Sequence, residues 1–472
     1  MKRTEAIELP AEEIARQRAW MREFASLEGR PQTYCVVTYG CQMNAHDSET
    51  LEGMLSEMGM TPAPGREQAD FVIFNTCCVR DNAQRRALGN VVWLKELKKT
   101  RPEMMVAVCG CMMQQPGMGE QILRQYPFVD LAFGTHNLYR FPQLMLQAVK
   151  TRRRVVEVLQ DDAGSIPEEL PVRRSSPDHA YITIMYGCNN FCSYCIVPYV
   201  RGRERSRSSA RILEEARQLK AEGVKEIMLL GQNVNSYGLD VEGELSFAQL
   251  LAALDDVGIE RIRFMTSHPK DLSDELIEVM ANGKHICHAL HLPVQHGSNR
   301  ILQSMNRRYT REAYLERVSA LRAKVPDISL TTDLIVGYPG ETEEDFEETC
   351  SLVERVGYDS AFTFIYSPRV GTRAADMPDQ IPEEVSSRRI QKLIAIQKEI
   401  THRRYAGYIG QIHGVLVEEA SKRDEHQMAG KNEYNITVNF PGTRDLIGQI
   451  VRVRITSSGE STLRGELIGM ES

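Results

Sequence analysis

The stretch GCNNFCSYC, residues 187–195, decides the fold assignment of this chain of 472 residues. It spaces Cys188, Cys192 and Cys195 as C-x3-C-x2-C, so three thiols share one short loop. Thiolates bind zinc and iron–sulfur clusters, and a structural zinc site takes four ligands. The motif therefore indicates either a distant fourth ligand, Cys287 or Cys350, or a [4Fe–4S] cluster with one iron left open. We favour the cluster, because both distant cysteines lie inside other predicted elements and are typical of buried small apolar residues.

The cysteine loop opens a series of alternating strands and helices. Helical patterns such as ARILEEARQLKAEG separate six predicted strands, and this alternation predicts a parallel sheet. Six units are fewer than the eight that close a barrel, so residues 179–404 are predicted to form a partial (β/α)6 barrel. Cys188 follows its first strand, on the side where such barrels form active sites. The predicted strands are 181–186, 225–230, 260–266, 288–293, 329–336 and 361–366.

Residues 31–160 carry a second alternation, which predicts an N-terminal wound parallel α/β domain. Cys41, Cys77 and Cys111 each follow one of its first three strands. Ligands of wound sheets gather at the carboxyl ends of strands, so we predict that these cysteines hold a second, auxiliary cluster. The predicted strands are 33–39, 70–75, 104–109, 129–133 and 155–158.

Other cysteines near this set have different expected roles. Cys35 and Cys109 lie within predicted strands and are expected to be packed. Cys78 adjoins Cys77 and is able to exchange roles with it, so that ligand assignment stays open. The chain has eleven cysteines, which in a reducing compartment favour ligands over disulfides.

Composition and pattern predict the remaining segments. Residues 1–30 form a charged helical N-terminal extension, and residues 161–178 form a linker without periodicity. Residues 405–472 hold β-rich runs separated by Gly, Pro and Asn, which predict a small antiparallel β-barrel. Neither a run of eighteen apolar residues nor an apolar signal segment is found, so no membrane span and a cytoplasmic location are expected.

Seven motifs, in order along the chain, resemble those of the methylthiotransferases, a family of radical S-adenosylmethionine enzymes. They are TYGCQMN, NTCCVRDNA, CGCMMQ, GCNNFCSYCIVPYVRGRE, LLGQNVNSYG, LHLPVQHGSNRILQSMNRRYT and TDLIVGYPGETEEDF. The resemblance covers about residues 33–468 and implies an N-terminal cluster domain, a radical S-adenosylmethionine barrel and a C-terminal TRAM domain. IVPYVRGRE and GQNVNSY are similar to the tRNA branch of the family. The N-terminal extension is longer than the family pattern.

The resemblance implies that C2 of N6-isopentenyladenosine at position 37 of tRNA receives a methylthio group. One S-adenosylmethionine methylates sulfur on the N-terminal cluster, and a second is cleaved at the barrel cluster to a 5′-deoxyadenosyl radical. A radical is suited to this carbon because acid–base catalysis has little effect on an unactivated aromatic C–H bond. The implied partners are the tRNA anticodon stem-loop and an electron donor such as flavodoxin or ferredoxin, and a monomer is expected.

Further residues are candidates for binding S-adenosylmethionine or RNA. The candidates for S-adenosylmethionine are Tyr194, Gln232, Asn233, Asp333 and Gly337, and each is equally consistent with a turn or a helix cap. The net charge of −7 does not indicate nucleic-acid binding by the whole chain, but RGRERSRSSAR (201–211) carries five arginines against one glutamate. The expected phosphate contacts are Arg201, Arg203, Arg205, Arg207, Arg452 and Arg454. A solvated loop or an exposed strand face is the alternative explanation for these arginines.

Three histidines and three other functions complete the predictions. His268, His291 and His296 also lie near strand ends, and we favour substrate contacts or packing over a metal site. The nearest alternative function is the same chemistry on threonylcarbamoyladenosine in tRNA. A non-catalytic, zinc-stabilised RNA-binding protein and a radical enzyme with a non-RNA substrate are the others. Iron and labile sulfide after anaerobic purification distinguish an iron–sulfur enzyme from a zinc protein.

Overall fold

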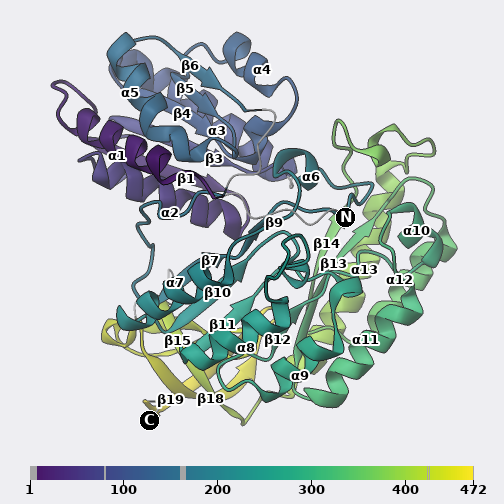
Figure 1. Cartoon of the computed structure of the whole chain (residues 1–472). Helices are drawn as coiled ribbons and strands as arrows, with labels where there is room; N and C mark the ends of the chain where they lie inside the picture. The colour runs from purple at the N-terminus through teal and green to yellow at the C-terminus, as the bar shows by residue number, and fades with distance from the viewer. Residues whose placement is uncertain (1–7, 79–80, 160–165, 422–423, 425, 471–472) are drawn as a thin grey trace.

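The computed structural model describes residues 8–78, 81–159, 166–421, 424 and 426–470. These residues form a parallel α/β sheet, an open β/α barrel and a small closed β-barrel, in that order along the chain (Figure 1). The predicted α/β fold class is confirmed. Parts of the predicted extension (1–7) and linker (161–165) lie outside the described residues. Within the described residues, every helix is too short or too polar to cross a membrane.

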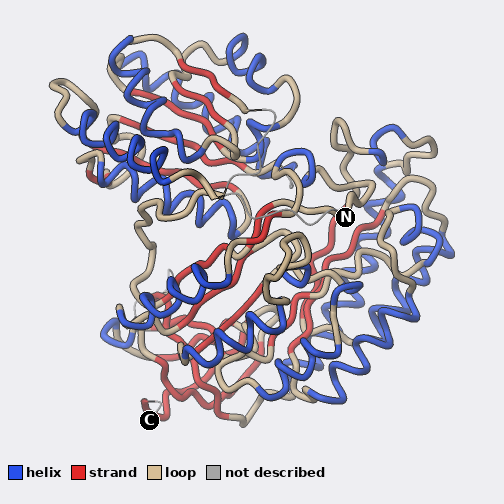
Figure 2. The backbone as a smooth tube through the Cα atoms, viewed as in Figure 1, coloured by secondary structure: helices blue, strands red, loops and turns tan. Residues whose placement is uncertain are grey.

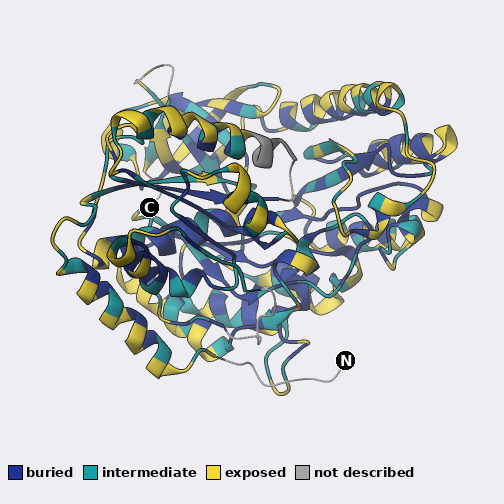
Figure 3. Cartoon of the chain, turned by 90° about the horizontal axis from the view of Figure 1, so that it is seen from above, coloured by how far each residue is buried: buried dark blue, intermediate teal, exposed yellow. Residues whose placement is uncertain are grey.

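The N-terminal sheet has six strands in the order β2-β1-β3-β4-β5-β6, and all its described pairings are parallel. Helices cover both faces of this sheet, which is why β3 and β4 are nearly continuous apolar runs. Figure 3 shows buried strands beneath helices whose outer faces are exposed. The elements are α1 Ala11–Ala25, β1 Thr33–Tyr39, α2 Gln42–Glu57, β2 Thr61–Pro62, β3 Phe71–Thr76, α3 Asp81–Thr100, β4 Met105–Cys109, η1 Cys111–Gln114, α4 Met118–Gln125, β5 Leu131–Phe133, η2 Leu138–Arg140, α5 Phe141–Thr151 and β6 Val155–Glu157.

Six parallel strands form the barrel, in two sheets of three: β7, β10 and β11, and β12, β13 and β14. A bridge between Ile262 and Ile286 joins the two sheets, while no described pairing joins β7 to β14, so the barrel is open on one side (Figure 2). The strands and main helices are β7 His179–Thr183, α7 Ser209–Ala221, β10 Glu226–Leu230, α8 Phe247–Val257, β11 Arg261–Phe264, α9 Asp274–Asn282, β12 Ala289–His291, α11 Arg311–Lys324, β13 Ser329–Val336, α12 Glu343–Val356, β14 Ser360–Ile365 and α13 Glu383–Ala406. The shorter elements in the loops are β8 Met185–Tyr186, α6 Val197–Val200, β9 Arg205–Ser206, η3 Val234–Ser236, η4 Pro269–Asp271, α10 Asn299–Ser304 and η5 Arg373–Asp376.

The strand predicted at 181–186 is two separate strands. β7 ends at Thr183, and β8 leaves the barrel sheet to pair antiparallel with β9. This short pairing closes the base of the loop that carries Cys188, Cys192 and Cys195. The sequence hides the break, because a continuous apolar run does not reveal where a strand changes its partner.

The C-terminal barrel has five strands in the closed order β15-β16-β17-β19-β18. The predicted antiparallel barrel is confirmed, except that β17 and β19 pair parallel. A closed ring with an odd number of strands cannot alternate its direction throughout, so at least one parallel pair is required. The elements are β15 Ile412–Ala420, β16 Gln427–Asn432, β17 Thr437–Pro441, η6 Arg444–Leu446, β18 Ile450–Ser458 and β19 Thr462–Met470.

Two arginines of β11 attach the C-terminal barrel to the β/α barrel. Arg261 donates hydrogen bonds to two backbone carbonyls of the C-terminal barrel at 2.8 and 2.9 Å. Arg263 donates to the Asn432 carbonyl at 2.6 Å and pairs with Glu226 at 2.8 Å, and the two charged side chains are only 3% and 4% exposed. Because Arg261 begins β11, the C-terminal barrel lies at the end of the strands away from the cysteine loops (Figure 1).

Candidate metal centre

Cys41, Cys77 and Cys111 lie together at the carboxyl edge of the N-terminal sheet, directly after the neighbouring strands β1, β3 and β4. A hydrogen bond with the Cys77 thiol lowers the pKa of Cys41 to about 6, and the charge of Arg201 acts in the same direction. Burial raises the pKa of Cys111, while Arg201 opposes that rise. The structure therefore places the three thiols at one edge of the sheet, and their sharing of one centre stays a prediction.

Two buried asparagines, which the sequence analysis missed, hold this edge in shape. The side-chain amide of Asn44 donates to Asn75 Oδ1 at 3.0 Å, and Asn75 donates back to the Asn44 carbonyl at 2.8 Å. Gly110, with φ of +93°, leaves room for them, because a Cβ there would lie 2.4 Å from Asn75 Oδ1. The sequence signal for these two residues is an asparagine within three positions of the cysteine in both TYGCQMN and FNTCC.

The second set, Cys188, Cys192 and Cys195, lies in the loop that β8 and β9 close. The Cys195 backbone N–H donates to the Cys192 carbonyl at 2.9 Å, so the last two cysteines share one turn. Gly187, with φ of +73°, precedes the first cysteine, and a Cβ there would lie 2.0 Å from the Arg203 carbonyl. Burial raises the pKa of Cys188 to about 11.

One buried arginine contacts a sulfur in each cysteine set. Arg201 Nε donates to Cys111 Sγ at 3.0 Å, and Arg307 Nη1 donates to Cys192 Sγ at 3.4 Å. The two arginines are 6% and 5% exposed. No carboxylate of the described residues lies within ion-pair distance of Arg307, so the negative charge nearest to it would come from thiolates.

The donor atoms fit iron–sulfur clusters. Among the described residues, no three His, Cys, Asp or Glu side chains converge on the position of a single metal ion. Three thiols beside a buried guanidinium suit an anionic cluster, because a buried cation requires a negative partner and hydrogen bonds to sulfur tune such clusters. Cys287 and Cys350 do not join the barrel set, since one lies beside Arg263 and the other on α12 in the barrel core.

Cys78 directly follows Cys77 and is buried. Burial raises its pKa well above the ordinary value, Cys111 and Cys195 contribute to the rise, and Arg369 opposes it. The remaining thiols of this region, Cys35 and Cys109, lie in β1 and β4 as expected.

The five candidates for S-adenosylmethionine binding have identifiable structural contacts. Gln232 Oε1 accepts a hydrogen bond from the Gly187 N–H and so steadies the turn before the cysteine loop. Asn233 donates to Asp271 at 2.8 Å, although its Oδ1 is buried without a partner among the described residues. Asp333 lies 3.6 Å from His291, and Tyr194 packs beside the cluster of apolar side chains around Tyr338.

Gly337 is required by helix packing. Its φ is +72°, and a Cβ there would lie 2.2 Å from Ser386 Oγ of α13. This contact accounts for the glycine, and its part in binding S-adenosylmethionine stays a prediction.

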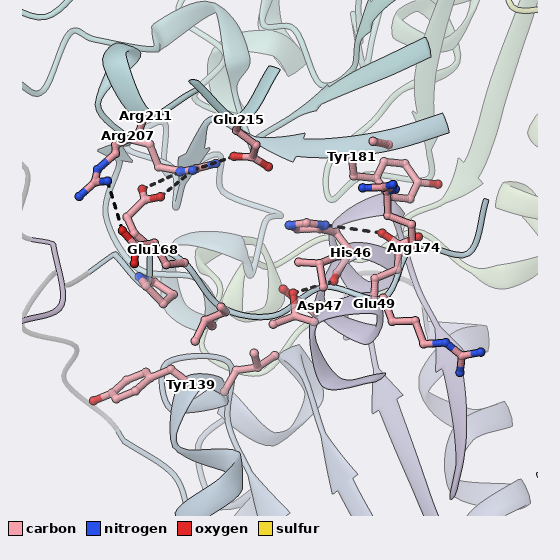
Figure 4. Close-up of a pocket in the computed structure, with 18 of the residues that line it drawn as sticks. His46, Asp47, Glu49, Tyr139, Glu168, Arg174, Tyr181, Arg207, Arg211 and Glu215 are labelled. Atoms are coloured by element: carbon pink, nitrogen blue, oxygen red, sulfur yellow. Dashed lines mark hydrogen bonds and ion pairs between the residues drawn. The ribbon is translucent and has the colours of Figure 1, made fainter. Parts of the chain in front are cut away.

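The arginine run 201–211 does not form the exposed phosphate-binding surface that was predicted. Arg207 is buried and pairs with Glu168 at 2.6 Å and Glu215 at 2.8 Å (Figure 4). Arg201 is buried against Cys111. Arg205 is partly buried, and desolvation lowers its pKa to about 10. Of the four arginines in this run that were predicted to contact phosphate, 201, 203, 205 and 207, only Arg203 is exposed.

The arginines of the C-terminal barrel are placed differently. Arg452 and Arg454 are exposed on β18, where they alternate with the buried Val451 and Val453. They therefore point away from the core of the C-terminal barrel, as the sequence pattern predicts.

The three histidines are buried and do not converge on one metal position. His296 pairs with Glu341 at 3.1 Å in the core, and His291 contacts Thr331 at 2.9 Å. Burial lowers the pKa of His268, and the charge of Arg307 acts in the same direction. These contacts agree with packing.

A polar cavity of about 1000 Å³ separates the N-terminal sheet, the linker and the barrel (Figure 4). His46, Asp47 and Glu49 of α2 line one wall, and Arg207 and Glu215 line another. Its charged groups are of both signs and largely paired with one another.

Comparison with known proteins agrees with this architecture. Residues 33–134 match the Uncharacterized protein family UPF0004, residues 182–353 the Radical SAM superfamily and residues 407–468 the TRAM domain. A tRNA-2-methylthio-N(6)-dimethylallyladenosine synthase of Thermoanaerobacter sp. (strain X514) is 51% identical over 459 residues, which are 97% of each chain. One of Carboxydothermus hydrogenoformans is 52% identical and covers 93% of this chain and 99% of its own.

A solved structure shares the fold alone. The radical S-adenosylmethionine methyltransferase TsrM of Kitasatospora setae aligns with 70% of this chain and 72% of its own at a TM-score of 0.51. Its sequence is only 15% identical to this chain.

Proposed function

Because the chain belongs to the family of tRNA-2-methylthio-N(6)-dimethylallyladenosine synthases, which are radical S-adenosylmethionine enzymes, we propose that it attaches a methylthio group to C2 of N6-dimethylallyladenosine in tRNA. Dimethylallyl and isopentenyl are names for the same side chain. The chain is a tRNA methylthiotransferase that uses S-adenosylmethionine and an iron–sulfur cluster. The proposal extends this to position 37 of the tRNA and to two molecules of S-adenosylmethionine, one a methyl donor and one a radical source.

Two clusters are proposed, each held by three cysteines. Cys188, Cys192 and Cys195 would hold the cluster that, with S-adenosylmethionine bound, supplies the electron for cleavage to the 5′-deoxyadenosyl radical. Cys41, Cys77 and Cys111 would hold the auxiliary cluster. The observation that supports this division most is that Cys188, Cys192 and Cys195 lie in the stretch matching the Radical SAM superfamily, whereas the other three cysteines lie in the separate matching stretch 33–134.

The surrounding side chains then have defined tasks. Arg307 places a buried positive charge at Cys192, and Tyr309 holds that guanidinium by a hydrogen bond of 2.9 Å. Gln232 fixes the turn at Gly187 from which the cysteine loop starts. Both contacts hold the loop in one shape before any ligand binds, which lowers the cost of ordering it later.

An aromatic pair made by Phe191 of the cysteine loop and the exposed Tyr199 forms a platform that suits an unstacked RNA base. Phe191 and Tyr199 pack edge to face with ring centroids 5.8 Å apart, and the Arg203 guanidinium lies 4.2 Å from the Phe191 ring centre. Tyr199 is 48% exposed, and Phe191 has the unusual φ of +46°. RNA loops are recognised by stacking of bases on aromatic and arginine planes, so we assign this platform to a base next to the modified adenosine.

Tyr199→Ala is expected to weaken binding of the modified anticodon stem-loop by about 5- to 150-fold, because one base stack contributes about 1–3 kcal/mol. Fluorescence anisotropy with labelled RNA measures the change. Tyr199→Phe keeps the ring and serves as the control. Wild-type affinity in the alanine variant would remove the platform from the proposal.

Arg452 and Arg454 are proposed to contact tRNA phosphates. Changing both to alanine is expected to weaken binding equally for all tRNA sequences and to reduce the slope of log affinity against log salt by about 2. Titrations at several potassium chloride concentrations measure the slope. An unchanged slope would mean that β18 does not face the RNA.

The decisive experiment for the function is mass spectrometry of tRNA nucleosides after anaerobic incubation with reconstituted protein, S-adenosylmethionine and a reductant. The expected product is the 2-methylthio form of N6-dimethylallyladenosine. A product formed only on threonylcarbamoyladenosine would support the alternative substrate, and no tRNA product would contradict the proposal.

Further parts of the proposal concern partners and organisation. We propose flavodoxin or ferredoxin as electron donor, a monomeric state, and domain limits at residues 30, 160, 178 and 404. Light scattering after gel filtration tests the monomer, and reduction of the protein by purified flavodoxin tests the donor.

A further inference from the structure

We infer that Arg201, which belongs to the barrel segment, is a positioning residue for the auxiliary cluster of the N-terminal domain. The inference rests on the proposed function, because it requires iron at Cys41, Cys77 and Cys111. It assigns this arginine a role that differs from the phosphate contact expected from its sequence context.

The geometry places Arg201 between two groups of the N-terminal domain. Its Nε donates to Cys111 Sγ at 3.0 Å, and its Nη2 donates to Asp47 Oδ2 at 2.6 Å. Both charged side chains are about nine-tenths buried, at 7% and 11% exposure. The guanidinium therefore joins a cysteine after β4 to a carboxylate of α2.

The backbone that carries Arg201 is itself held by the N-terminal domain. The Val200 carbonyl accepts a hydrogen bond from Thr135 Oγ1 at 2.8 Å. Ile196 and Val200 are buried in the same apolar cluster as Cys111 and Met112. Figure 1 shows α6, which ends at Val200, lying between the N-terminal sheet and the barrel.

Charge explains why an arginine occupies this position. Burial disfavours a charged guanidinium, and Asp47 alone offsets one positive charge with one negative charge. A cluster held by three thiolates would add negative charge at Cys111. The Nε of Arg201, which contacts Cys111 Sγ, is placed to stabilise that charge. Groups that hydrogen-bond to metal ligands in this way orient the ligands and tune the metal.

The placement also links the two centres. Arg201 lies in the segment that directly follows Cys195, a ligand of the other proposed cluster. Arg307 contacts Cys192 from within the barrel, whereas Arg201 crosses from the barrel to the N-terminal domain. The auxiliary cluster would thus be supported by Arg201, from the segment that follows the cysteine loop of the barrel cluster.

The test isolates the auxiliary cluster in the full-length chain. Cys188, Cys192 and Cys195 are changed to alanine, the protein is reconstituted with iron and sulfide, and its iron content and midpoint potential are measured. Arg201→Met in this parent is expected to weaken iron retention by about 10- to 100-fold and to make the midpoint potential more negative. Arg201→Lys keeps the charge and is expected to restore the potential in part.

Two further variants separate charge from structure. Asp47→Asn removes a negative charge near Cys111 and is expected to shift the potential in the opposite direction, to a more positive value. Thr135→Val removes the hydrogen bond to the Val200 carbonyl without changing any charge, so the potential should stay that of the parent.

The outcomes that overturn the inference are distinct from failure of the proposed function. Iron in the parent with an unchanged potential in both Arg201→Met and Asp47→Asn would overturn the inference alone. Shifts of the same sign in those two variants would also overturn it. A parent chain that binds no iron would overturn the inference together with the auxiliary cluster.

Discussion

A chain in which Cys41, Cys77 and Cys111 are all alanine is expected to lose about half of its iron and all of its methylthiolated product, while it still cleaves S-adenosylmethionine. The reason is that the cleaving cluster has its own three cysteines in a loop closed by β8 and β9. Iron and sulfide assays, chromatography of 5′-deoxyadenosine and mass spectrometry of tRNA nucleosides measure the three quantities.

The matched control changes Cys35 and Cys109 to alanine. These thiols lie in β1 and β4 of the same sheet, but within the strands rather than after them. Iron content and product should remain those of the wild type. If cleavage of S-adenosylmethionine disappears with Cys41, Cys77 and Cys111, the two cysteine sets do not have separate tasks.

Arg263→Met is expected to lower the free energy of unfolding by about 3–5 kcal/mol, because it leaves a buried carboxylate without its cation. Glu226 is 4% exposed and lies 2.8 Å from the Arg263 guanidinium. The substitution also removes the hydrogen bond to the Asn432 carbonyl that attaches the C-terminal barrel. Urea unfolding followed by circular dichroism measures the change.

Arg454→Met is the control for this stability prediction. Arg454 is exposed on β18, and a change there should alter the free energy of unfolding by less than about 0.5 kcal/mol. A loss of less than about 1 kcal/mol in Arg263→Met would mean that water or Arg261 compensates for the missing guanidinium.

The cysteine positions were predictable from the sequence because a simple rule connects them to space. In a parallel sheet with alternating helices, residues that follow neighbouring strands meet at one edge. Cys41, Cys77 and Cys111 follow β1, β3 and β4, which are neighbours in the sheet. The rule needs only approximate strand ends, so errors of one or two residues in the predicted strands did not affect it.

The roles of the arginines were not predictable in this way. A run of arginines indicates an exposed surface only if no carboxylates are folded against it. Asp47 lies 154 residues from Arg201, and Glu168 lies 39 residues from Arg207. Nothing local in the sequence pairs these residues, because the pairing arises from the packing of two domains and the linker.

The glycine at 337 gives a similar lesson. The sequence makes Gly337 a candidate for binding S-adenosylmethionine, and the structure shows that Ser386 of α13 leaves no room for a side chain there. A pattern predicts that space is short without indicating which group occupies that space.

The burial of Ile196 and Val200 in the N-terminal core has a consequence for module exchange between related enzymes. The covalent boundary of the N-terminal part falls before β7, whereas two of its core side chains arrive from beyond that boundary. A recombinant fragment that stops at the linker would lack Ile196 and Val200 and so would expose the apolar side chains that they cover. A chimaera with a foreign barrel would have to supply equivalent side chains at α6. The two parts are thus expected to have been inherited as a pair.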